Sequence, residues 1–301
     1  MFDIVSYIIG AKSGGGGSGG GFNLSSCIIF AGDAPFSIAY TNEKAWDGKL
    51  EYTTGTGGWV EWNGTDTISA SDGIVAMRGT GNTVISDYPS SKRFAITGAN
   101  VYCYGNIESL LDYKTSAKGD HPIMGEHCFE GLFEYCKTLC KAPDLGATTL
   151  SPYCYGGMFS GCTALKQAPA LPVTTLAPYC YADMFKDCTS LTTAPELPAT
   201  TLASNCYLFM FQRCTAITEA PELPATTLAE YCYSSMFDGC TGIKLSTTEA
   251  DNYTIAYRIP PTGTATGSTE SGLYNMFKDT GGTFTGSPSA NTTYYMWDYN
   301  A

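Results

Sequence analysis

Two cysteines recur along the second half of this chain at a fixed spacing of 26 residues. They occupy Cys128, Cys154, Cys180, Cys206 and Cys232 in one register and Cys136, Cys162, Cys188, Cys214 and Cys240 in the other. A Met-Phe pair lies between them in every copy except the first, which has Leu132-Phe133. Repetition at such a period predicts a repeat architecture, in which each unit buries its apolar face against its neighbours.

A sixth, degenerate copy follows at Gly272-Leu-Tyr-Asn-Met-Phe-Lys-Asp-Thr280. Gly272 and Thr280 stand at the two cysteine positions, and the copy lies 40 residues after the fifth, which leaves an insertion of 14 residues over the period. Terminal repeats of a stack need an atypical outer face. We therefore expect this copy to belong to a C-terminal cap.

The motif Met-Phe-x-x-Cys-Thr-x-Leu resembles the BspA-like leucine-rich repeat of bacterial surface proteins and phage proteins, over roughly residues 122–283. The period lies within the range of leucine-rich repeats, and the resemblance implies a leucine-rich-repeat solenoid. Each unit departs from the family pattern in a segment such as Ala-Pro-Glu-Leu-Pro-Ala-Thr-Thr-Leu. Its strand should be short or irregular, because proline cannot donate to a strand ladder.

On a helical projection, Cys180, Met184 and Cys188 fall within one narrow arc. This placement predicts that the repeated cysteines face the core as free thiols stacked along the repeats. Disulfides between neighbouring units are the alternative, and they require an oxidising compartment. No metal or other cofactor is expected. One cluster is left open for zinc: His127, Cys128, Cys136 and Cys140.

The region 22–114 contains short β-rich runs separated by turn signals. Trp59-Val-Glu-Trp62 followed by Asn63-Gly64 predicts a hairpin with a type I′ turn, and Asp72-Gly73 separates two further runs in the same way. Such a pattern predicts an antiparallel β-sandwich or barrel-like domain. Its segment Ile96–Ile107 resembles the β-domain that precedes BspA-like repeats. With the repeats behind it, the predicted fold class is α+β.

The N-terminus begins with an apolar peptide and a glycine tract. Its apolar residues follow the spacing of one helical face: Phe2, Ile4, Val5, Ile8 and Ile9. The peptide lacks the basic start of an export signal and is too short to span a bilayer. Together with the glycine tract it is similar to the N-termini of virion fibre proteins of tailed bacteriophages, which implies an anchor on a flexible tether. A merely disordered end of the chain is the alternative.

These features divide the chain into five expected parts. They are an anchor peptide (1–12), a Gly-rich linker (13–21), a β-rich domain (22–114), the repeats of period 26 (115–245), and a degenerate repeat with C-terminal cap (246–301).

The net charge of −12 argues against nucleic acid or an anionic membrane as a partner, because binding phosphates requires clustered cations. The positions of the acidic side chains follow the repeat period, so we expect these side chains to form a solvated face. We therefore expect no catalytic residue and no enzyme. Paired glycosidase carboxylates remain the alternative. The acids concerned are Asp183, Asp187, Glu196, Glu222 and Asp238.

Two dipeptides in each unit vary from copy to copy while the core positions repeat. The variable face of a repeat protein is often its binding face. The fourth copy carries the most distinctive set, which we take as candidate ligand-binding residues: Leu208, Phe209, Gln212 and Arg213. Neutral drift of these positions is an equally good interpretation. Three repeated tyrosines either pack with the hydroxyl group exposed to water or stack on sugars, and we favour packing. They are Tyr153, Tyr179 and Tyr231.

These observations predict a structural appendage of a phage virion, a head or tail fibre or decoration protein. Its N-terminus would bind capsid or tail proteins, and its repeats would adhere to glycans or proteins of the host surface or the environment. Fibres are often symmetric assemblies, so a homo-oligomer is an open expectation. A bacterial BspA-like surface adhesin is the alternative, and a polysaccharide-degrading enzyme is a third.

Overall fold

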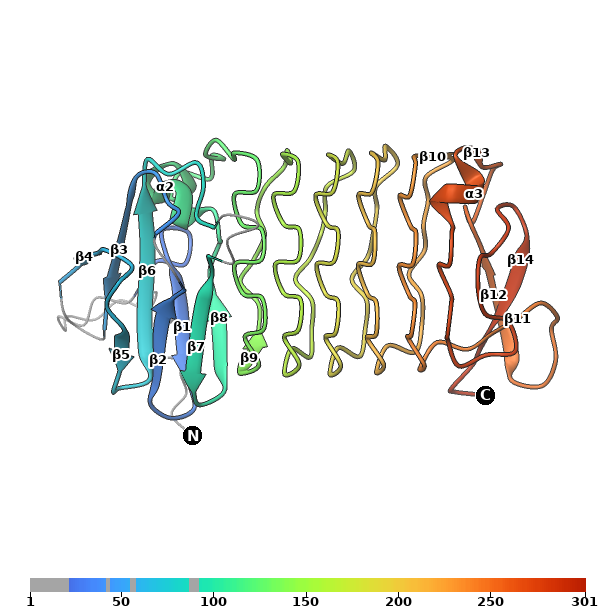
Figure 1. Ribbon diagram of the computed structural model, residues 1–301, viewed down its shortest axis with the longest axis horizontal. Helices are drawn as coiled ribbons and strands as arrows, with labels where there is room; N and C mark the ends of the chain where they lie inside the picture. Colours follow the sequence, from blue (N-terminus) through green and yellow to red (C-terminus); the bar gives the residue numbers. More distant parts are fainter. Residues whose placement is uncertain (1–21, 42–43, 55–57, 87–91) are drawn as a thin grey trace, which may run out of the picture.

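The computed structural model describes residues 22–41, 44–54, 58–86 and 92–301. The expected anchor peptide, with Phe2, Ile4, Val5, Ile8 and Ile9, and the Gly-rich linker lie outside the described residues. Figure 1 shows an elongated molecule, with strands at its N-terminal end, a row of coils in the middle and a small sheet at its C-terminal end. None of the helices described has the length and apolarity needed to cross a bilayer.

The N-terminal part is built from strands in two sheets. The strands are β1 (Ile28–Gly32), β2 (Phe36–Tyr40), β3 (Lys49–Thr53), β4 (Val60–Trp62), β5 (Ile68–Ala70), β6 (Ile74–Thr80), β7 (Phe94–Gly98) and β8 (Val101–Tyr104). One sheet has the order β4-β3-β6-β1-β8-β9, where β9 is Leu139–Lys141, and the other has the order β5-β2-β7. Apart from the parallel pair β8 and β9, the strands pair antiparallel.

Both sheets contribute side chains to one hydrophobic core. Strand β2 alternates buried and half-buried residues, so Phe36, Ile38 and Tyr40 point inward as expected for a sheet with one covered face. Phe30 of β1 meets Phe94 of β7 edge-to-face at 6.0 Å between ring centroids. The same core continues into the repeats, since Phe94 packs on Phe133 of the first coil at 5.6 Å.

The hairpin predicted at Asn63-Gly64 is wrong. Strand β4 pairs with β3, and β5 beyond the turn belongs to the other sheet. Of the two residues only Gly64 has a positive φ, whereas the Asn63 side chain accepts the backbone N–H of Thr65 at 2.9 Å. The asparagine thus forms a local Asx-type turn that carries the chain from one sheet to the other. The turn at Gly73 likewise connects β5 and β6, which lie in different sheets.

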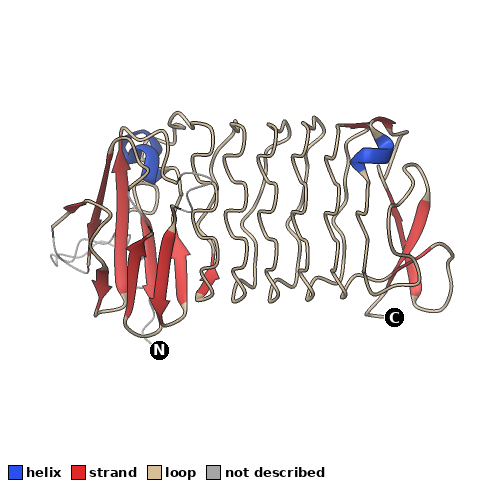
Figure 2. Ribbon diagram, in the orientation of Figure 1, coloured by secondary structure: helices blue, strands red, loops and turns tan. Residues whose placement is uncertain are grey.

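The regular secondary structure of the described residues is mostly β-strand, which does not favour the predicted α+β class. The described residues contain only two short helices, α2 (Ser109–Ser116) and α3 (Thr269–Gly272), and the coils between them are turns and loops (Figure 2). The helical placement of Cys180, Met184 and Cys188 was therefore wrong, although all three are buried. A residue with left-handed backbone recurs at every fourth position of this segment, and such residues interrupt an α-helix.

We call the coils that contain residues 127–240, together with the degenerate copy, the repeat stack. Along one side of each coil, alternate backbone N–H groups donate to carbonyls of the next coil. Tyr155 donates to Cys180 at 3.1 Å, and Phe159 donates to Met184 at 2.9 Å. The intervening N–H groups close i to i+3 turns within the coil, as when Met158 donates to Tyr155 at 3.2 Å. Each coil is thereby bonded both to itself and to its neighbour.

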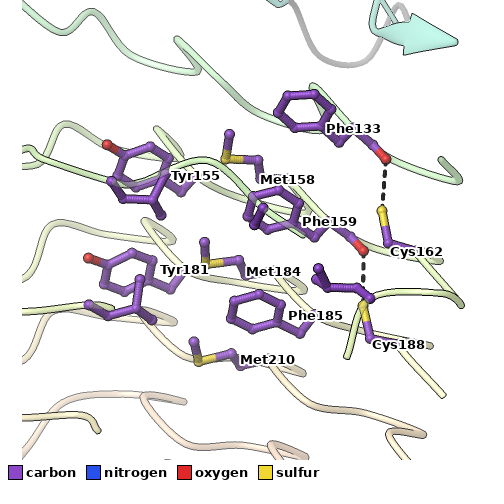
Figure 3. Close-up of a cluster of buried hydrophobic side chains, with 14 of the residues drawn as sticks. Phe133, Tyr155, Met158, Phe159, Cys162, Tyr181, Met184, Phe185, Cys188 and Met210 are labelled. Carbon is purple, nitrogen blue, oxygen red and sulfur yellow. Dashed lines mark hydrogen bonds between the residues drawn. The ribbon is translucent and has the colours of Figure 1, made fainter. Parts of the chain in front are cut away.

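Columns of identical side chains fill the interior of the repeat stack (Figure 3). The rings of Phe133, Phe159, Phe185, Phe211, Phe237 and Phe277 stack at 5.5–5.7 Å with nearly parallel planes. A second column runs through Phe129, Tyr155, Tyr181, Tyr207 and Tyr233 at 5.7–6.0 Å. The repeated methionines are also buried. A stack of this kind buries apolar area only when neighbouring coils are present.

The C-terminal end covers the last coil. The remaining strands are β10 (Thr227–Leu228), β11 (Leu245–Ser246), β12 (Tyr253–Arg258), β13 (Thr266–Gly267) and β14 (Thr293–Trp297). The degenerate copy continues the ladder, since Phe237 donates its N–H to Met276 at 2.9 Å. The chain between the two copies contains β12, which pairs with β14 in the sheet β11-β14-β12. The insertion thus lies outside the stack and supplies part of the terminal sheet.

Candidate binding face

One side of the repeat stack is formed by residues with left-handed backbone, three in each complete coil. These are His127, Gly131 and Tyr135; Tyr153, Gly157 and Gly161; Tyr179, Asp183 and Asp187; Asn205, Phe209 and Arg213; and Tyr231, Ser235 and Gly239. Their φ values lie between 50° and 75°. We call this side the corner face, because each such residue sits at a turn corner.

The variable dipeptides of the sequence are turn corners. The second residue of each dipeptide has the left-handed backbone, as at Gly157, Asp183, Phe209 and Ser235. A left-handed backbone is uncommon for a bulky residue such as Phe209. Such strain is typical of positions that the surrounding structure holds in place. The dipeptides can differ between coils because the buried columns and the backbone hydrogen bonds between coils do not depend on their side chains.

The structure places all four candidate residues on this face, in a single coil. Phe209 and Arg213 are corners, and Leu208 and Gln212 directly precede them. Leu208, Phe209 and Gln212 are half-buried between neighbouring coils, and Arg213 is exposed. They lie together as the spacing predicted, and their ligand-binding role stays a prediction.

Neighbouring coils hold the polar members of this patch in defined positions. Arg213 forms a bidentate ion pair with Asp187 of the preceding coil, with N–O distances of 2.6 and 2.7 Å. The hydrogen bond from Arg213 lowers the pKa of Asp187. Gln212 donates to Asp238 of the next coil at 2.9 Å. These contacts orient the patch before any ligand arrives.

A lysine from the preceding coil completes the patch. The Lys186 ammonium lies 5.3 Å from the centroid of the Phe209 ring, within the range of a cation–π contact, and donates to Asp183 at 3.1 Å. The cationic groups of the patch, Lys186 and Arg213, are thus each paired with a carboxylate, Asp183 and Asp187. This arrangement suits a neutral, hydrogen-bonding ligand better than a strongly charged one.

An aromatic column occupies the first corner of successive coils. His127 stacks on Tyr153 at 4.6 Å and Tyr153 on Tyr179 at 4.5 Å, with interplanar angles of 15° and 8°. The His127 ring also hydrogen-bonds the Glu130 carboxylate. Burial raises the pKa of Tyr153, and the neighbouring Tyr179 adds to that shift. The packing favoured for Tyr153 and Tyr179 is present, and His127 belongs to the same column.

All thirteen cysteines are free thiols. The repeated ones are buried, and burial raises the pKa of Cys154, Cys188 and Cys240 to about 12. A thiol is nucleophilic only as thiolate. These side chains are therefore chemically inert packing groups at neutral pH.

The structure also places the residues considered for metal binding and for acid catalysis. No group of three or more His, Cys, Asp or Glu side chains placed to hold a metal occurs among the described residues. Asp183, Asp187 and Asp238 are bonded to Lys186, Arg213 and Gln212. The lowered pKa of Asp187 is opposite to what a glycosidase acid needs. Glu196 and Glu222 line an open groove of about 450 Å³ with the repeat prolines.

Sequence reasoning missed the left-handed corners and the ion pairs between coils. A signal for the corners was present in the recurrence of Gly, Asp and Asn at four-residue intervals, since these residues tolerate positive φ best. No comparable signal marked the pair of Asp187 with Arg213, because side chains 26 residues apart meet only once the coils are stacked.

The chain was compared with protein families, with curated proteins and with solved structures, and none of these comparisons finds a match. Its function must therefore be argued from the corner face and from the sequence.

Proposed function

We propose that this chain is a non-enzymatic appendage of a tailed-phage virion, and that its corner face binds a host or environmental ligand. One observation carries the proposal: the buried scaffold is the same from coil to coil, whereas the residues at the corners differ. The Phe185, Phe211 and Phe237 rings keep a spacing of 5.5–5.6 Å, whereas the corners beside them are Asp187, Arg213 and Gly239. A constant frame with varied side chains is what a recognition surface requires.

In this proposal the repeat stack is a leucine-rich-repeat solenoid of the BspA-like type, preceded by a β-sandwich. The period, the buried Met-Phe and cysteine columns and the single shared core support that assignment. The Pro-rich segments make isolated bridges such as Gln167 to Thr193 and, at the end of one of them, the two-residue strand β10, in agreement with the short or irregular strand expected there. The solenoid would act as a rigid spacer between particle and ligand.

Attachment is assigned to residues 1–12, with residues 13–21 as the tether. This part of the proposal rests on the apolar spacing and on the resemblance to phage fibre N-termini. Gold labelling of a C-terminal tag on intact particles tests location. We expect label on heads or tails, lost when residues 1–12 are deleted. Label found only on bacterial envelopes would favour the BspA-like adhesin instead.

Ligand binding by the patch is tested with a coil-swap variant. Leu208→Gly, Phe209→Gly, Gln212→Ser and Arg213→Gly together give the fourth coil the corner residues of the second, Gly156-Gly157 and Ser160-Gly161. Because those residues already occupy equivalent corners, the variant should fold. We expect adsorption of the purified protein to host cells to fall at least tenfold, with an unchanged thermal transition. Unchanged adsorption would contradict the role of the patch.

A further inference from the structure

The first-corner column of aromatic rings is interrupted once. His127, Tyr153 and Tyr179 stack in succession, the fourth coil presents Asn205, and the fifth presents Tyr231. Among the described residues, Tyr179 has a stacked ring on one side only and Tyr231 has none. Tyr231 is 41% exposed, which places it among the few exposed large hydrophobic side chains of the described residues.

The backbone of the fourth coil does not shift to close the gap in the aromatic column. Tyr179, Asn205 and Tyr231 have φ values of 54°, 57° and 52°, so their side chains leave the backbone in the same conformation. The N–H of Tyr179 donates to Ser204 at 3.2 Å, and that of Asn205 donates to Glu230 at 2.9 Å. The interior rings Tyr181, Tyr207 and Tyr233 stack through the same three coils at 5.8 and 5.7 Å. The coil that contains Asn205 therefore has the same backbone conformation and the same stacking contacts as its neighbours.

The separation of the two tyrosines follows from the coil spacing. The two adjacent tyrosine rings of this column are 4.5 Å apart, and at that spacing two rings two coils apart, such as Tyr179 and Tyr231, would be separated by about 9 Å. A flat ring midway would lie at about 4.5 Å from each, which is within the range of favourable stacked contacts. Asparagine is much shorter than tyrosine and fills only the base of this space. Its carboxamide makes no hydrogen bond within the described part of the chain.

From this geometry we infer that Tyr179 and Tyr231 form the walls of a slot that binds one neutral pyranose ring, with the Asn205 carboxamide at its floor. This inference rests on the proposed adhesive function and names the ligand class. The two aromatic faces would cover the C–H faces of the sugar, and the amide would donate to and accept from a ring hydroxyl. A nucleotide could fill the same space, but its phosphates would approach a protein with a net charge of −12.

Affinity electrophoresis tests the slot. The full chain is run in native gels that contain soluble β-glucan, mannan, galactan or starch, and in a gel without polysaccharide. We expect retardation by at least one polysaccharide. The decisive variant is Asn205→Tyr, which fills the slot without removing either wall and should abolish retardation while leaving the thermal transition unchanged or raised. Tyr231→Ala should abolish it as well.

Tyr135→Ala is the matched control, because Tyr135 is also an exposed corner tyrosine, at 55% exposure, and lies outside the slot. It should be retarded like the unaltered chain. Retention of binding in Asn205→Tyr would overturn the slot, and no retardation of the unaltered chain by any of the four polysaccharides would overturn the sugar assignment. Neither result affects the labelling of particles, so failure of this inference is distinct from failure of the proposed virion location.

Discussion

The Sγ of Cys188 donates a hydrogen bond to the carbonyl oxygen of Phe159, 3.1 Å away in the preceding coil. The relationship recurs at Cys162, Cys214 and Cys240, with distances of 2.9–3.1 Å to the equivalent phenylalanine carbonyls. Figure 3 shows the bonds of Cys162 and Cys188. The same Phe159 oxygen accepts the N–H of Cys162 in its own coil. The second cysteine register thus links adjacent coils through side chain and backbone together.

Replacing Cys188 by alanine should lower the free energy of unfolding by about 1–3 kcal/mol. The change removes a buried sulfur, leaves a small cavity and deprives the Phe159 carbonyl of its second donor. Urea unfolding followed by circular dichroism measures the loss.

The control for this variant is Cys140→Ala, because Cys140 is only half-buried. Its effect should stay within about 0.5 kcal/mol, as for most surface substitutions. Equal effects of the two substitutions would show that the bond from Cys188 to Phe159 contributes nothing particular.

The buried thiols predict a loss of stability at alkaline pH. The ordinary thiol pKa of 9.0 applies to the unfolded chain, whereas the folded pKa of Cys154, Cys188 and Cys240 is about 12. Below pH 9 both states keep the proton. Above it the unfolded state releases protons that the folded state retains, so stability falls as pH rises. Each such thiol contributes about 1.4 kcal/mol per pH unit, against a typical total stability of about 5–15 kcal/mol.

We therefore expect cooperative unfolding between about pH 9 and pH 11, monitored by circular dichroism. Ionisation of the thiols, measured with a thiol-specific alkylating reagent, should rise in the same transition. Thiolates that form while the native signal persists would contradict the assignment of these residues to the core.

The sequence correctly predicted that the repeated cysteines point inward, although it predicted the wrong secondary structure for them. Cys180, Met184 and Cys188 are four residues apart, and this interval places side chains on one side both of an α-helix and of the turn series seen here. Periodicity alone cannot separate the two. The left-handed corners at Tyr179, Asp183 and Asp187 decide against the helix, and backbone handedness is not visible in the spacing of apolar residues.

The candidate patch was predictable as a group of residues but not as a set of contacts. Leu208, Phe209, Gln212 and Arg213 stood out because they differ from their counterparts in the other copies. Their partners Asp187 and Asp238 are one period away in each direction, so the pairing depends on coil register. The interruption of the aromatic column at Asn205 likewise becomes a spatial feature only when the coils are stacked.

The left-handed corners predict opposite outcomes for two adjacent glycines. Gly157 has a φ of 58° and open space where a Cβ would stand, whereas Gly156 has no left-handed backbone and its added Cβ would lie 3.3 Å from the carbonyl oxygen of Tyr153, a tight contact. Gly157→Ala should cost about 1–2 kcal/mol through backbone strain alone. Gly156→Ala should cost less than about 1 kcal/mol, because the next coil carries Ala182 at the equivalent position. Gly157→Asn should recover part of the loss, because asparagine tolerates this conformation. Thermal unfolding of the three variants checks the order.

The ion pair between Asp187 and Arg213 should contribute little to stability. The side chains are 34% and 53% exposed, and exposed pairs are typically worth under about 1 kcal/mol even when bidentate. A double-mutant cycle with Asp187→Asn and Arg213→Gln gives the coupling energy, which should shrink further in 1 M salt. A coupling above about 3 kcal/mol would show that the pair holds the coils together instead of orienting the patch.

The N-terminal sheets cover the first coil, so a change that loosens them should expose the end of the repeat stack. Phe94 of β7 donates its N–H to Leu132, and Val101 of β8 donates to Thr138. Helix α2 packs closely on β6 at Gly79, where an added Cβ would lie 1.6 Å from the carbonyl oxygen of Leu110. Backbone at that distance cannot give way as a flexible side chain can.

Gly79→Ala should therefore destabilise the protein by at least about 3 kcal/mol. Partial separation of the N-terminal sheets would leave the unpaired backbone of the first coil open to association with other chains. We expect a lower thermal midpoint together with larger species in size-exclusion chromatography. Gly58→Ala is the control, because nothing lies within 4 Å of its added Cβ. If Gly79→Ala melts earlier yet stays the same size, the sheets stabilise the chain without protecting the end of the stack.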